Sequence, residues 1–261
     1  MSMKITTNLL FLLITGMVML GCEKEPDETW SGKVRSNATR SGTPPDYGYH
    51  LYHVVDYENG SLTPVQWRMV QETFDGLERK YPVICQLFCM MMQEGFKFKI
   101  EIEPALQGGG YSGIYKPQTK TIYVKSEEIL NPANPWKERV LLHEFLHALQ
   151  HAVMKDGMDK SVWGRNVEFE VAVMTDIMMY HRDNYMWDIL GVHRFKNEVV
   201  RETYSNGYLP RIYGTMYTTD EEFNHYAEMF DMYKNYPFRE DFTPVLLRRL
   251  LHMVQLYEPY E

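Results

Sequence analysis

The sequence predicts an α+β fold in which helices come first, strands follow, and a mainly helical C-terminal part completes the chain. Residues 96–103 alternate apolar and charged side chains, which is the period of a half-buried strand. The segments before and after this strand look helical. An order of helix, strand and helix without internal repeats is typical of the α+β class.

Two helices are predicted before the strands. Thr63 is a candidate N-cap and Pro64 stands at the first helical position, so a helix is expected over residues 63–80. A second helix is expected over residues 82–93, where Gly95 follows its end. Cys85 and Cys89 lie four residues apart in it, a spacing that gives poor disulfide geometry. We expect two buried thiols, because the neighbouring sequence supplies no further metal ligands.

A hairpin and further helices follow. Residues 113–115 and 121–124 flank a turn-forming segment and therefore predict a hairpin. Asn134 and Pro135 are a typical cap and first position of a helix. Three further helices are expected downstream, over residues 167–181, 219–233 and 243–256.

Composition and charge exclude several classes of protein. The chain has 261 residues, of which 44% are hydrophobic and 24% are charged. These values exclude a fully disordered, collagen-like or multi-span membrane protein. Lys and Arg number 27 against 35 Asp and Glu, so no excess of cations is present to neutralise phosphates, and we expect no nucleic-acid partner.

The N-terminus carries a targeting pattern. Lys4 precedes an apolar run over residues 9–21, about 20 Å as a helix and too short for a bilayer core of about 30 Å. Gly21 and Cys22 end it and resemble the lipobox of bacterial lipoproteins. The resemblance implies a signal peptide over residues 1–21 and lipidation of Cys22. It also implies an anchor in the bacterial cell envelope, at the outer membrane and facing the periplasm or the surface. An ordinary signal peptide with an incidental cysteine is the alternative.

A tether and one main domain are expected after the anchor. Residues 22–46 contain almost nothing apolar to bury, so we expect them to stay flexible. The remaining chain, residues 47–261, is long enough for one domain, which would divide near residue 155 if it divides at all.

The chemistry of the chain is concentrated in one predicted helix. Residues 143–147 are HEFLH, an HExxH pattern. On a helix, His143 and His147 project from one face and can reach one metal ion, and Glu144 lies close enough to take a proton from a water. Leu141, Phe145 and their neighbours form an apolar back. Two surface histidines with this spacing by chance are the alternative.

The stretch over residues 111–176 resembles the zincin metallopeptidases, in their gluzincin branch. The resemblance implies a small mixed sheet with an edge strand over the HExxH helix, a catalytic Zn²⁺, and hydrolysis of peptide bonds by metal-activated water with Glu144 as general base. The strand made of Thr121, Ile122, Tyr123 and Val124 would be the edge strand that binds an extended substrate. The metzincin branch fits poorly, since Gln150 stands where its pattern has Gly.

The resemblance also implies a third ligand from the helix after HExxH, within residues 166–172. Glu168 and Glu170 are the candidates, and they differ by about 200° around a helix. Glu170 lies in the middle of an apolar face, where a carboxylate needs a compensating ion, whereas Glu168 lies on a more polar side and can stay hydrated. We therefore expect Glu170 to be the ligand, with a buried salt bridge as its alternative role. Glu168, Asp176 and His151 remain candidates for an alternative ligand or for a residue that orients a ligand histidine.

Together these features predict a lipid-anchored zinc peptidase that acts on a peptide or protein substrate. The main alternative is a non-catalytic envelope lipoprotein that keeps the fold and binds peptide or glycan. A solute-binding lipoprotein with an incidental HExxH motif would bind no metal at all.

Overall fold

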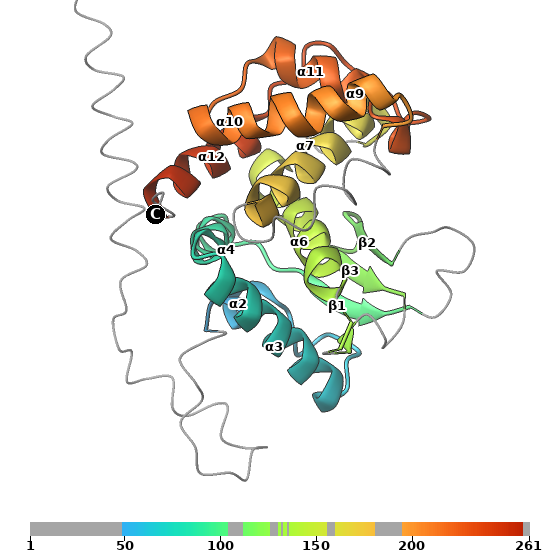
Figure 1. The fold of residues 1–261 in the computed structure, drawn as a ribbon. Helices are drawn as coiled ribbons and strands as arrows, with labels where there is room; N and C mark the ends of the chain where they lie inside the picture. Colours follow the sequence, from blue (N-terminus) through green and yellow to red (C-terminus); the bar gives the residue numbers. More distant parts are fainter. Residues whose placement is uncertain are drawn as a thin grey trace, which may run out of the picture. The chain divides into compact units, whose positions relative to one another are not determined.

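Two long helices, α6 (Lys137–Met154) and α7 (Lys160–Tyr180), pack against each other in the middle of the fold (Figure 1). Strands β2 and β3 and the helices α3 and α4 contact α6, and α2 contacts α4. The later helices α10, α11 and α12 contact α7. The predicted α+β class is confirmed. The structure is a computed structural model that describes residues 49–103, 112–125, 130–131, 133–134, 136–155, 160–180 and 195–257.

The targeting segment of the chain lies outside the described residues. This concerns the expected signal peptide over residues 1–21, the tether over residues 22–46 and the lipidation site Cys22. Within the described ranges, no helix combines the length and the apolar composition that a bilayer span requires.

Three helices form the N-terminal part: α2 (Tyr49–Val54), α3 (Pro64–Lys80) and α4 (Val83–Gln93). Thr63 caps α3 as predicted. Its hydroxyl accepts from the Gln66 N–H at 3.3 Å, and its own N–H donates to Gln66 Oε1 at 2.8 Å, which completes a capping box. The two predicted helices are thus confirmed, whereas α2 was not predicted because its six residues carry no cap or proline signal.

The sheet has the order β1-β3-β2, with β1 at Lys99–Ile102, β2 at Gly113–Lys116 and β3 at Thr121–Val124. Strand β3 pairs with β1 in parallel and with β2 in antiparallel orientation. The predicted hairpin is confirmed. The expectation that residues 121–124 form an edge strand is wrong, because β3 is paired on both sides and β2 is the edge of the hairpin.

Helix α6 carries the HExxH motif and, as expected, has an apolar back. Phe145 is fully buried and its ring contacts those of Phe74, Phe88 and Phe98. The helix begins at Lys137, later than the expected cap at Asn134, whose side-chain oxygen instead accepts from the Trp136 N–H at 2.9 Å. Contacts between α6 and both α3 and α4 place the motif on a well-packed support.

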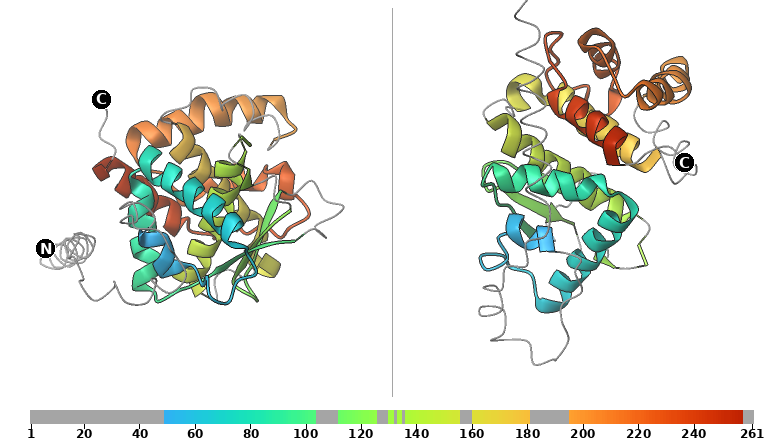
Figure 2. Two further views of the ribbon diagram at one scale, coloured as in Figure 1. Left: turned by 90° about the horizontal axis from the view of Figure 1, so that it is seen from below. Right: turned by 90° about the vertical axis from the view of Figure 1, so that its left-hand side faces the viewer.

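Helix α7 is surrounded by other elements. All residues from 166 to 178 are buried, and α7 contacts α6, α10, α11 and α12. Figure 2 shows α12 running beside α7. The C-terminal elements are α9 (Glu198–Thr203), η4 (Tyr204–Tyr208), α10 (Leu209–Thr215), α11 (Asp220–Glu228), η5 (Asp231–Tyr233) and α12 (Val245–Tyr257). Helix α7 begins before the expected residue 167, and the helix expected over residues 219–233 is divided into α11 and η5.

Candidate metal centre

The two motif histidines lie one turn apart on α6. Their ring centroids are 4.9 Å apart and the ring planes are almost perpendicular. The side chain of His143 is 22% exposed, whereas that of His147 is 2% exposed. One histidine therefore lies at an opening to solvent and the other in the interior.

Helix α7 contributes a carboxylate to the same place. Glu168 Oε2 lies 3.1 Å from His147 Nε2 and 3.9 Å from His143 Nε2. One ligand atom from each of these three residues lies within 4.8 Å of the other two. Ligand atoms about 2.1 Å from a tetrahedral zinc ion are about 3.4 Å apart, so the spacing is compatible with one ion.

Gln150 determines which nitrogen of His147 carries the proton. The Gln150 side-chain nitrogen donates to the Val167 carbonyl at 3.1 Å and to Glu170 Oε2 at 2.8 Å. Both partners are acceptors, so this end of the amide must be the NH₂ group, and the amide oxygen faces His147 Nδ1 at 3.0 Å. His147 Nδ1 therefore carries a proton and donates it to the Gln150 oxygen.

In a neutral His147, the second nitrogen, Nε2, is unprotonated and lies 3.1 Å from a carboxylate oxygen. In a neutral His147 with its proton on Nδ1, the lone pair of Nε2 points at Glu168 Oε2, an atom that only accepts. A proton on His147 Nε2 would turn its contact with Glu168 Oε2 into a hydrogen bond, but Nε2 of His143 lies near the same oxygen, at 3.9 Å. One cation at this point would contact all three atoms, and two imidazole nitrogens with one carboxylate are a typical donor set for catalytic zinc.

The structure places the two glutamates of α7 the opposite way round from the sequence-based expectation. Glu168, expected on a hydrated side, is 3% exposed and lies with the histidines. Glu170, expected to be the ligand, is fully buried, and its Oε1 accepts from the N–H groups of Leu246 and Leu247, each at 3.0 Å. The buried carboxylate of Glu170 is therefore compensated by the N-terminus of α12 and by the Gln150 amide, and not by a metal ion.

Glu170 nevertheless belongs to the support of the site. Its carboxylate holds the Gln150 amide, which in turn holds His147 Nδ1. Burial raises the pKa of Glu170, and the hydrogen bonds from Leu247, Gln150 and Leu246 lower it in part. Residues that orient a ligand histidine in this way stabilise its tautomer and ring position. The sequence signal for this role was the place of Gln150, one turn after His147 on the same face.

The candidate base, Glu144, contacts the edge strand. Its Oε2 accepts from the Tyr115 N–H of β2 at 2.7 Å, and the residue is largely buried. Gly113 makes the close approach of β2 to α6 possible, because a Cβ atom there would lie 2.8 Å from Val140 Cγ1 and 3.1 Å from Glu144 Cγ. The sequence predicted neither contact, since both depend on the distance between a strand and a helix.

The other candidates have partners elsewhere. His151 Nδ1 lies 2.7 Å from the Tyr115 hydroxyl, and its ring contacts Phe96. Asp176 Oδ2 accepts from the Tyr204 hydroxyl at 2.7 Å, so its carboxylate contacts η4, and the residue that holds His147 Nδ1 is Gln150 instead. The residues expected to bind substrate, Thr121, Ile122, Tyr123 and Val124, lie in the central strand, where their backbone groups pair within the sheet.

Comparisons with known proteins give no information on the function of this site. Comparisons of the chain with protein-family profiles, with curated proteins and with solved structures found no match.

Proposed function

We propose that this chain is a zinc-dependent peptidase of zincin type, in which His143, His147 and Glu168 bind the metal and Glu144 is the general base. The proposal keeps the motif and mechanism expected from the sequence and changes one ligand. A lipid anchor at Cys22 in a bacterial envelope is part of the same proposal, and a peptide or protein is the substrate class.

The convergence of three donors on one point carries this proposal. Glu168 Oε2 is close to both histidine nitrogens, and the Gln150 amide oxygen faces His147 Nδ1, which makes Nε2 the unprotonated nitrogen of a neutral ring. The exposed side of His143 gives solvent and substrate access to that point, as a catalytic site needs. The zincin resemblance is supported by the arrangement of an edge strand, β2, beside the HExxH helix and of a glutamate on the following helix.

The protein groups divide the chemistry between them. When bound, zinc polarises a carbonyl oxygen and lowers the pKa of a water to about 7. Glu144 is one residue from His143, and it can accept a proton at this point and deliver it to a leaving amine. The Tyr115 N–H holds Oε2 of this carboxylate, so its position is fixed before substrate binds.

A metal analysis combined with one isosteric variant tests the proposal. The full chain is stripped with a chelator, reloaded with zinc and assayed on a library of quenched fluorescent peptides. We expect bound zinc and hydrolysis in the parent, and in Glu144→Gln the same zinc content with hydrolysis lower by about 10³-fold or more. Equal hydrolysis by parent and variant, or no hydrolysis by a zinc-loaded parent, would contradict the peptidase assignment.

A second candidate is a metal-binding envelope protein without hydrolytic activity. It is favoured by the 2.7 Å contact between Glu144 and Tyr115, since that carboxylate also has a role in holding the strand. The same assay separates the two, because this candidate requires zinc in the parent and no peptide cleavage at any loading.

The membrane anchor has its own test. With Cys22 as the lipidated residue, Cys22→Ser should move the protein from the membrane fraction to the soluble fraction and abolish labelling by an alkyne fatty acid. Acyl labelling that persists in the variant would refute the assignment.

A further inference from the structure

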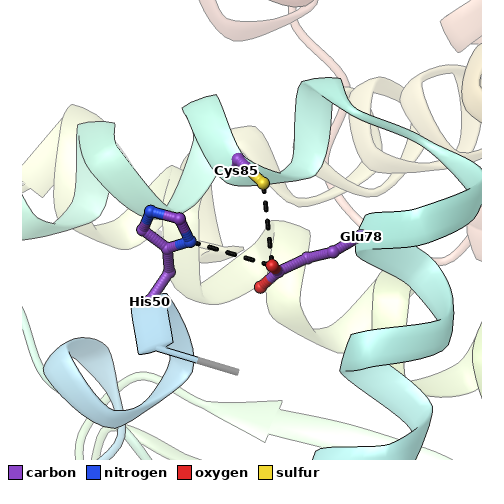
Figure 3. A group of neighbouring side chains, drawn as sticks. All are labelled: His50, Glu78 and Cys85. Atoms are coloured by element: carbon purple, nitrogen blue, oxygen red, sulfur yellow. Dashed lines mark hydrogen bonds and ion pairs between the residues drawn. The ribbon is translucent and has the colours of Figure 1, made fainter. Parts of the chain in front are cut away.

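A second group of metal-ligand side chains lies far along the sequence from the HExxH motif. His50 of α2, Glu78 of α3 and Cys85 of α4 point toward one another (Figure 3). Glu78 Oε2 lies 3.6 Å from Cys85 Sγ and 3.7 Å from His50 Nδ1, and all three ligand atoms lie within 4.8 Å of one another. We propose that these three residues form a second metal site, for Zn²⁺ or a similar borderline-soft divalent cation.

The spacing fits such an ion. Zinc binds sulfur at about 2.3 Å and oxygen or nitrogen at about 2.1 Å, which places sulfur and oxygen ligands about 3.6 Å apart in a tetrahedron and nitrogen and oxygen ligands about 3.4 Å apart. The observed distances are 3.6 Å and 3.7 Å. The thiol disfavours Mg²⁺ and Ca²⁺, which prefer sites made of oxygen atoms alone.

The buried carboxylate of Glu78 gives an independent reason to expect a ligand. Its side chain is only 6% exposed, and Oε1 is buried with no hydrogen-bond partner. A buried carboxylate oxygen without a partner is costly, and a bound cation compensates it. His50 and Cys85 alone leave that oxygen unsatisfied.

The surrounding helices hold the three ligands in place. Glu78 stands in the last turn of α3 and Cys85 in the first turn of α4, so the short connection between these helices brings the two together. The ring of His50 stacks on Phe88, with centroids 6.5 Å apart and planes 7° apart. A metal here would link α2 to the α3–α4 pair.

Binding has a defined proton balance. Without metal, the Cys85 thiol donates to Glu78 Oε2. The metal replaces that proton, which passes to solvent, and the sulfur binds as a thiolate. No oxidation or reduction is involved.

Cobalt substitution tests this site separately from the HExxH site. Bound Co²⁺ gives a near-ultraviolet sulfur-to-metal charge-transfer band only when a thiolate is a ligand, and the residues proposed for the HExxH site include no cysteine. We expect the stripped full chain to develop this band on addition of Co²⁺, and zinc analysis to give two equivalents per chain. His143→Gln should keep the band and lose one equivalent, so failure of the HExxH assignment would not remove it.

Matched variants connect the band to the cluster. Cys85→Ser should abolish the band and lower bound metal by one equivalent, and Glu78→Gln should weaken Co²⁺ binding by tenfold or more while keeping the fold by circular dichroism. Glu72→Gln, on the same helix α3 but exposed to solvent, removes a carboxylate outside the cluster and should change neither readout. A parent chain without the band, or a band undiminished in Cys85→Ser, would overturn the proposal.

Discussion

Replacing Glu170 by alanine should destabilise the fold by about 1–4 kcal/mol. The carboxylate caps α12 through two N–H groups and accepts a third bond from the Gln150 amide. Loss of a cap costs up to about 2 kcal/mol, and a buried amide donor without a partner costs about 1–3 kcal/mol. Removing a carboxylate whose pKa burial raises offsets part of this cost.

The assay is urea unfolding of the stripped protein, followed by circular dichroism, with Glu168→Ala as the matched variant on the same helix. Glu170→Ala should lower the free energy of unfolding with an unchanged denaturant slope, and Glu170→Gln, which keeps one acceptor oxygen, should lower it by less. Glu168→Ala should instead lose the metal of the HExxH site. If Glu170→Ala abolished zinc binding while remaining as stable as the parent, and Glu168→Ala kept its zinc, the structural argument would be refuted.

Three further predictions concern the surroundings of the site. Gly113→Ala should lower the free energy of unfolding by about 1–3 kcal/mol, because the new Cβ would push against Val140 and Glu144. Peptidase activity should fall by on the order of 10²-fold with zinc retained, and unchanged kinetics would contradict this. His151 should titrate below its ordinary pKa of 6.5 in an NMR titration, because of burial and then the charge of Lys120. Neutral His151 should stabilise the folded protein fully above pH 6.5. This stabilisation should be lost as the pH falls through the folded-state pKa, because the unfolded chain takes up the proton first. Titration of His151 above 6.5 would be inconsistent with the structure. Thr63→Ala should cost about 1 kcal/mol in thermal or urea unfolding by removing the cap of α3, and no change would exclude a role for the capping box.

Local signals in the sequence predicted the elements whose causes are local. Thr63 and Pro64 define the start of α3, and the spacing of His143 and His147 needs only a helix to place both rings on one face. Such features depend on residues within one or two turns, so a sequence contains the information directly. The start of α6 was missed by a few residues because Asn134 caps a turn before the helix.

Contacts between distant segments could not be predicted in the same way. The choice between Glu168 and Glu170 assumed that α7 has a polar side, but the helix is buried all round, so both carboxylates needed partners. The partners of Glu170 are backbone groups of residues 246 and 247, which no periodicity reveals. In the hairpin, both strands look alike in sequence, and only pairing with β1 makes β3 central.

The support of the HExxH site has a consequence for the order in which the protein can mature. His147 is oriented by Gln150, Gln150 by Glu170, and Glu170 by the first turn of α12. During synthesis the motif leaves the ribosome about a hundred residues before Leu246, so for some time the nascent chain carries both histidines without α12. A chain interrupted before α12 would hold every proposed ligand and still lack the contact that orients His147, so it should bind the metal more weakly than the complete chain.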